Sequence, residues 1–157
     1  AALLYGAETW RLTKQLRSKL RTFHNMKVRQ MAGVTRWHTR RYRIKTEVLE
    51  KRLGLQPLDW YLANRSLRWI GHVARMGPER LPARLAFGWV DKKRRSGGQA
   101  ASLASTTKVH LAVMNLPTNE RDWLPLAANP REWWRLINKK PHEALPESRR
   151  AAMPGLH

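Results

Sequence analysis

The segment from Thr35 to Lys45, TRWHTRRYRIK, concentrates side chains that could bind a polyanion. Guanidinium groups bind phosphate through paired hydrogen bonds, and aromatic rings can stack on unpaired bases, so we expect this segment to be a loop lying on RNA or on single strands. For Trp37 and Tyr42 two alternatives stay open, stacking on bases or anchoring the loop in the core. The candidate nucleic-acid contacts of the segment are Arg36, Trp37, Arg40, Arg41, Tyr42, Arg43 and Lys45.

Side chains suited to catalysis are present but are not grouped. A two-metal site needs neighbouring carboxylates, and the eleven Asp and Glu residues are scattered along the chain without a convincing pair. The six histidines lack the i, i+4 spacing of a zinc helix, and no serine or cysteine nucleophile motif occurs. We therefore expect no enzyme activity, no catalytic residue, no metal site and no cofactor.

The charge balance points to nucleic acid as the partner. The 31 Lys and Arg residues outnumber the 11 Asp and Glu residues, which gives a formal net charge of +20 on 157 residues. Because neutralised phosphates release condensed counterions, affinity should be high at low salt and should fall steeply as salt rises. A membrane surface is the alternative polyanion, but no apolar run approaches the roughly 20 residues of a spanning helix. We expect no membrane span and no small-molecule substrate.

Apolar residues at helical spacing predict a mainly α fold. The first long helix is expected from Thr13 to Ala32, with Thr13 as its N-cap and Gly33 ending it. Its cations are not interleaved with acids, so they cannot pair within the helix and form a second candidate surface. The candidate contacts on this helix are Lys14, Arg17, Arg21, Lys27 and Arg29.

Further helices follow along the chain. Thr46 should cap a short helix closed by Gly54, and Pro57 should open a helix that runs to about Met76 with a wide apolar stripe for burial. Residues 78–91 contain two prolines and are expected to be too broken for a long helix, and RLAFGWV (84–90) is expected to be either extended or a short turn of helix. Weaker helical patterns cover 100–115, 119–128 and 130–139. We expect a small helical bundle over 1–77, an irregular segment with a basic, glycine-containing loop over 78–99, C-terminal helices over 100–140 and an extended tail over 141–157.

The basic loop is a second candidate phosphate site. Its cations are Lys92, Lys93, Arg94 and Arg95, and they precede two glycines. The pattern lacks the terminal Lys-Ser/Thr of a nucleotide-binding P-loop. A solvent-exposed linker is the alternative interpretation.

Five strings resemble one protein family, and they occur in one order. They are LLYGAETW (3–10), RLGLQPLDWYLANRSLRWIGHVARM (52–76), RLP (80–82), GGQ (97–99) and DWLPLAANPREWWRLI (122–137). They look like the thumb, and the segment after it, in reverse transcriptases of non-LTR (LINE-type) retrotransposons. The resemblance implies a thumb-like helical bundle that holds a template and primer duplex. The paired aspartates of the family's palm would lie before Ala1, and after GGQ the chain reads AASLASTTK where the family usually continues with Lys, Arg and a Trp.

Three hypotheses of function follow. In the favoured one, a reverse-transcriptase fragment serves as a non-catalytic RNA-binding structural protein in a large ribonucleoprotein such as an organellar ribosome, with RNA and neighbouring proteins as partners and the mitochondrion as compartment. In the second, the chain is the thumb of a mobile-element polymerase whose palm lies elsewhere, and the protein is expected in the nucleus. In the third, it is an accessory subunit of a protein complex anchored by its tryptophans. Because Ala1 is not Met, we expect a processed product or the downstream part of a longer translation.

Overall fold

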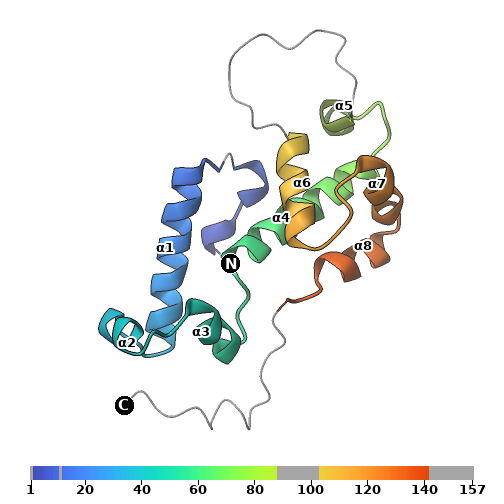
Figure 1. The fold of residues 1–157 in the computed structure, drawn as a ribbon. Helices are drawn as coiled ribbons and strands as arrows, with labels where there is room; N and C mark the ends of the chain where they lie inside the picture. The colour runs from blue at the N-terminus through green and yellow to red at the C-terminus, as the bar shows by residue number, and fades with distance from the viewer. Residues whose placement is uncertain (1, 11, 88–102, 142–157) are drawn as a thin grey trace. The chain divides into compact units, whose positions relative to one another are not determined.

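The computed structural model describes residues 2–10, 12–87 and 103–141 (Figure 1). Over these residues the chain forms eight α-helices, two short 3-10 helices at Ala2–Leu4 and Ala7–Thr9, and no strand. The expected mainly α fold is confirmed. The basic loop at Lys92–Arg95 and all but the first residue of the expected tail lie outside the described residues, and the expected boundaries at 77, 99 and 140 stay predictions.

The described residues divide into two compact units, and the division falls within one helix, α4 (Leu58–Ala74). The first unit takes in the described parts of Ala1–Thr9 and Leu62–Lys139. The second takes in those of Trp10–Tyr61 together with Lys140 and Pro141. Each unit has a hydrophobic core of its own.

The second unit begins with α1 (Lys14–Met31) and continues through α2 (Arg36–Arg41) and α3 (Thr46–Leu53). The Thr13 side chain accepts a hydrogen bond from the Leu16 amide at 3.2 Å, which confirms it as the N-cap of α1. Gly33 after α1 and Gly54 after α3 both have φ near +66°, a conformation that favours glycine, and both ends agree with the sequence-based prediction.

The core of this unit is small. Three residues are buried together: Val28 of α1, Val34 between α1 and α2, and Leu49 of α3. Ile44 and Leu55 pack against them. A polar contact adds to this packing, because His24 Nε2 lies 2.9 Å from Glu50 Oε1 and the Glu50 residue is only 4% exposed. A buried carboxylate is costly without a partner, so this pair holds α1 against α3.

The apolar spacing in 13–32 predicts α1 correctly, but the apolar residues at that spacing are not all buried. Val28 is buried, whereas Leu16, Phe23 and Met31 are 46%, 40% and 63% exposed. The reason is that α3 packs on the Val28 side of the helix. Hydrophobic periodicity shows that a face is apolar and does not show that the chain covers it.

Two further expectations in this unit are wrong. The segment 35–45 was expected to be a loop but contains the six-residue helix α2, because Thr35 and His38 supply a capping box. Thr46 was expected to cap the next helix but is its first residue, and Lys45 occupies the N-cap position without a side-chain hydrogen bond.

The first unit contains most of α4 together with α5 (Leu81–Phe87), α6 (Leu103–Val113), α7 (Glu120–Ala128) and α8 (Pro130–Ile137). The apolar stripe of α4 is buried as expected. The core residues of the unit are Leu67, Ile70, Val73, Ala83, Leu111, Trp123, Ala127, Trp133 and Ile137. Residues 78–91 were expected to be too broken for a long helix; the structure has the seven-residue α5 there, and its buried Ala83 joins this core.

Polar contacts fix α7 and α8 against α4. The Trp133 indole Nε1 donates to the Leu67 carbonyl at 2.9 Å, and the Asn64 side-chain amide donates to the Ile137 carbonyl at 2.9 Å. Arg75 donates to the Ala127 carbonyl at 2.7 Å. Each bond joins a side chain to a backbone carbonyl of another helix, and the first of them satisfies the buried indole N–H of Trp133.

Candidate nucleic-acid interface

A capping box shapes the beginning of α2. The Thr35 hydroxyl accepts a hydrogen bond from the His38 amide at 3.3 Å, and the Thr35 amide donates to His38 Nδ1 at 3.4 Å. The same Nδ1 lies 2.8 Å from Thr35 Oγ1. Because the Thr35 amide can only donate, Nδ1 acts as an acceptor, which places the proton of a neutral His38 ring on Nε2. The capping box therefore orients the His38 ring as well as the backbone.

The end of α2 is a tight turn. The Tyr42 amide donates to the His38 carbonyl at 2.9 Å, and the Ile44 amide donates to the Thr39 carbonyl at 3.1 Å. Between these two bonds Arg43 has φ of +49°, a left-handed conformation that is uncommon for a residue with a side chain. The turn lets Ile44 return to the core of the unit while Arg43 stays at the surface.

Three aromatic rings meet on this helix and turn, and we call Trp37, His38 and Tyr42 the aromatic cluster. His38 and Tyr42 are nearly parallel, with ring centroids 6.3 Å apart at 12°. Trp37 meets both of them edge to face, at 5.2 and 6.2 Å. Such edge contacts are favoured by the ring quadrupoles and hold the rings in relation to one another.

The aromatic cluster does not anchor the segment in the core. Trp37 is 62% exposed and Tyr42 is 59% exposed. The buried Val34 and the half-buried Ile44, on either side of α2, do the anchoring. Sequence reasoning named the two aromatics as possible anchors because they are the larger side chains, and it missed the two aliphatic residues that flank them.

Five cations surround the aromatic cluster, and all of them are exposed. Within the described part of the chain they form no ion pair with an acid. Arg40 and Arg41 lie in the last turn of α2, where the helix dipole favours positive charge. We call this group the basic cluster; it consists of Arg36, Arg40, Arg41, Arg43 and Lys45.

Among the described residues, two of the cations of α1, unlike those of the basic cluster, form ion pairs with an acid. Arg21 Nη2 lies 2.7 Å from Asp59 Oδ2, and Arg17 Nε lies 3.6 Å from Asp59 Oδ1. These two arginines, expected to face nucleic acid, thus share a carboxylate at the beginning of α4. The sequence search missed the pairing because Asp59 is 38 residues from Arg21, outside the i, i+4 spacing that it tested.

The other three expected contacts on α1 have no acidic partner among the described residues. Lys14 is exposed at the first turn and Arg29 is half-buried in the last turn. Lys27 donates to the Gln30 side chain at 3.0 Å and lies 5.5 Å from the centre of the Phe23 ring. The structure brings all the α1 and α2 candidates into one compact unit.

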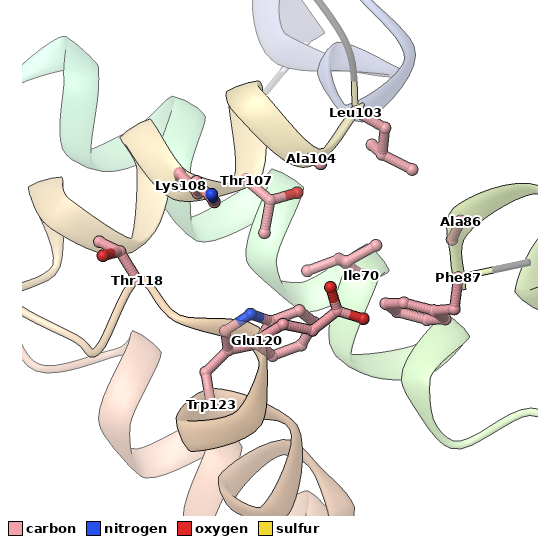
Figure 2. Close-up of a pocket in the computed structure, with 10 residues that line it drawn as sticks. All are labelled: Ile70, Ala86, Phe87, Leu103, Ala104, Thr107, Lys108, Thr118, Glu120 and Trp123. Atoms are coloured by element: carbon pink, nitrogen blue, oxygen red, sulfur yellow. The ribbon is translucent and has the colours of Figure 1, made fainter. Parts of the chain in front are cut away.

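No site for small-molecule chemistry stands out in the described residues. Among them no group of three or more His, Asp or Glu is placed to hold a metal ion, and no helix is long and apolar enough to cross a membrane. A pocket in the first unit has a volume of about 40 Å³, well below the several hundred Å³ of ordinary ligand sites. Figure 2 shows Ile70, Phe87 and Trp123 converging on it.

Comparisons of the chain with models of protein families, with curated proteins and with solved structures find no match. The resemblance to the reverse-transcriptase thumb therefore stays a hypothesis that depends on the five collinear strings. The basic cluster stands apart from that hypothesis, because it is defined by the charge, exposure and local geometry of its own residues.

Proposed function

We propose that this chain is a non-catalytic RNA-binding structural protein, and that the basic cluster is its principal phosphate-binding site. The observation that carries the proposal is that five cations within ten residues are exposed and free of acidic partners in the described part of the chain. Long cationic side chains held this close repel one another unless an anion lies between them. A phosphate backbone supplies such anions at regular, close spacing.

The geometry of α2 favours a backbone over a single anion. The cluster is spread along a capped helix and the turn after it, so its charges cover a surface rather than a single point. Arginine accounts for four of the five, and its planar guanidinium suits paired hydrogen bonds to phosphate oxygens. This arrangement is typical of a surface that tracks a strand.

The wider role is a subunit of a large ribonucleoprotein, such as an organellar ribosome in the mitochondrion, in which a thumb-like bundle once used on a template and primer duplex holds folded RNA. The resemblance of the chain to reverse-transcriptase thumbs supports this origin. The thumb of an active polymerase remains the second candidate, and the exposed cation Lys14 and the half-buried Arg29 on α1 favour it because they extend the basic surface along a long helix. What copurifies at native abundance separates the two roles: ribosomal RNA, or a polymerase with its own palm.

The proposal is tested by replacing all five residues of the basic cluster with alanine. Five phosphate contacts correspond to a slope of about −3.5 to −4.5 in a plot of log affinity against log salt concentration. The variant should bind a structured RNA more weakly, and the slope should flatten toward the remainder supplied by α1. Fluorescence anisotropy with a labelled RNA hairpin, measured from 50 to 300 mM KCl, gives both quantities.

The matched control removes the same charge from the first unit. It replaces five exposed arginines that lie away from the cluster in sequence: Arg68, Arg80, Arg84, Arg121 and Arg131. The control should keep most of the slope, because it removes the same net charge without touching the proposed site. An unchanged slope in the cluster variant, or an equal loss in the control, contradicts the assignment. Circular dichroism checks that both variants remain helical.

A further inference from the structure

The exposure of the aromatic cluster calls for an explanation, because large aromatic side chains contribute most when they are buried. Trp37 and Tyr42 are both about 60% exposed, while Trp123 and Trp133 of the same chain are at most 4% exposed. An isolated exposed ring is ordinary on a protein surface, but here two exposed rings lie within 6.2 Å of each other inside the basic cluster.

We propose that the aromatic cluster stacks on an unpaired base of the RNA strand whose phosphates the basic cluster binds. This inference deepens the proposed function and rests on it. It changes the ligand from any RNA duplex to a strand that offers at least one unstacked base, as in a bulge, a loop or a single-stranded end. Bases inside a continuous helix are stacked on each other and offer no free face to a protein ring.

The rings are prepared for such contact before RNA arrives. The capping box fixes His38, His38 lies parallel to Tyr42, and Trp37 touches both with its ring nearly perpendicular to theirs. Side chains already held by neighbours lose less conformational freedom on binding than mobile ones. Trp37 nevertheless keeps most of its surface open, so a base can add to the group without displacing a neighbour.

The cations beside the aromatic cluster favour RNA as the ligand of this surface. Arg40 and Arg41 follow Trp37 by three and four residues in α2, the spacing at which side chains share a helix face, so the exposed Trp37 ring has cations as neighbours on that face. A nucleotide presents a base and a phosphate a few ångströms apart, which matches a ring beside a guanidinium. An apolar protein partner would leave these cations without counter-charge, so RNA is the occupant that satisfies both parts of the surface.

The test compares two RNA hairpins that differ at one position. Both carry a single-nucleotide bulge, which is adenosine in one and an abasic nucleotide in the other, so the number of phosphates is the same. The protein should prefer the adenosine bulge by about tenfold, the gain expected from one stacked base. Trp37→Ala should remove that preference and leave the salt slope unchanged, whereas Trp37→Phe should keep part of it.

Trp134→Ala serves as the matched control, because Trp134 is also an exposed tryptophan, at 57%, and lies in the first unit. It should retain the preference for the adenosine bulge. Equal affinity of the wild-type protein for the two hairpins overturns the inference, and so does a Trp37→Ala variant that loses affinity for both equally. In either case an intact salt slope leaves the proposed function standing. Failure of the proposed function looks different, since the alanine variant of the basic cluster would then keep its slope.

Discussion

Asp59 determines how much of the α1 cationic surface is available to RNA. Its carboxylate is 30% exposed and lies within 4 Å of both Arg17 and Arg21, so any phosphate must compete with a carboxylate that is already in place. Exposed ion pairs contribute only about 0–1 kcal/mol, so the competition does not exclude RNA but reduces its gain. The arginines of α2 face no such competitor among the described residues.

Two double variants with the same change in charge test this difference. We expect alanine at Arg40 and Arg41 to flatten the salt slope of RNA binding by about 1.4–1.8, the loss of two phosphate contacts. Alanine at Arg17 and Arg21 should flatten it by less than half as much, because Asp59 has already neutralised part of their charge. Anisotropy titrations of one hairpin at a series of KCl concentrations measure both slopes. A larger effect at Arg17 and Arg21 would contradict the ranking.

The residue types of the candidate interface could be identified from the sequence, but their ion pairing and burial could not. Charge composition and local spacing were enough to single out 35–45, because all its relevant residues are near neighbours in the chain. They were not enough to find Asp59, whose contact with Arg21 depends on how α1 and α4 pack. The fate of Trp37 was left open for the same reason, since burial follows from tertiary structure and an aromatic ring suits either environment.

At the scale of elements, a glycine, Gly71, allows α8 to pack closely against α4. A Cβ atom added at Gly71 would lie 2.1 Å from the Trp133 Nε1 atom, far inside van der Waals contact. That indole is 2% exposed and donates its hydrogen bond to Leu67 one turn earlier in α4. The two helices can therefore approach this closely only because residue 71 has no side chain.

Gly71→Ala should destabilise the protein even though alanine favours a helix interior by about 1 kcal/mol over glycine. The added methyl group must displace a buried indole and its hydrogen bond, and overpacking of this kind costs about 1–3 kcal/mol before any lost bond is counted. Urea unfolding followed by tryptophan fluorescence should show a net loss of roughly 1–3 kcal/mol in the free energy of unfolding.

Gly77→Ala is the matched control for this substitution. The three atoms nearest to its added Cβ all belong to the carboxyl end of Glu79, an exposed and flexible side chain that can move aside. We expect a change within about 0.5 kcal/mol. A second control combines Gly71→Ala with Trp133→Phe, which should lose less stability than the two single changes added together, because the clash requires the indole ring. Equal effects of Gly71→Ala and Gly77→Ala would show that Trp133 does not limit position 71.

Helices with strong local signals could be predicted from the sequence, whereas α2 was missed and α5 was left open between an extended stretch and a short turn of helix. Thr13 and Gly33 bound α1 in the sequence and in the structure, and Gly54 ends α3 in both. The six-residue α2 and seven-residue α5 are too short to show a periodic pattern, and isolated helices of that length are marginal in water. They form because a capping box stabilises one and the core contact of Ala83 stabilises the other.

At the scale of the whole molecule, the net charge of +20 acts against folding and in favour of binding. Among the described residues each unit has a hydrophobic core, and the core cluster of the second unit is built around three buried aliphatic residues. Repulsion between the cations therefore destabilises a folded state that has little hydrophobic stabilisation. Salt and RNA both relieve the repulsion, salt by screening it and RNA by supplying the counter-charge.

Because salt also weakens the RNA complex, it should move the stabilities of the free and bound protein in opposite directions. The Tm of the free protein should rise from 50 to 200 mM KCl as repulsion between cations is screened. At 50 mM KCl, RNA at a hundred times its Kd should add about 2.7 kcal/mol, or roughly 5–10 °C in Tm. With five phosphate contacts the affinity falls about 200-fold by 200 mM KCl, so the same RNA concentration should then add almost nothing.

Thermal melts followed by circular dichroism, with and without a short RNA hairpin, measure the two curves. They should converge as salt rises, and the alanine variant of the basic cluster should show a smaller gap at 50 mM KCl. Neutral crowding agents of similar mass should not reproduce the low-salt gap, because excluded volume contributes at most about 1 kcal/mol. A gap that persists at 200 mM KCl would mean that contacts other than phosphate neutralisation dominate the complex. Charge complementarity would then be the wrong basis for this protein's function.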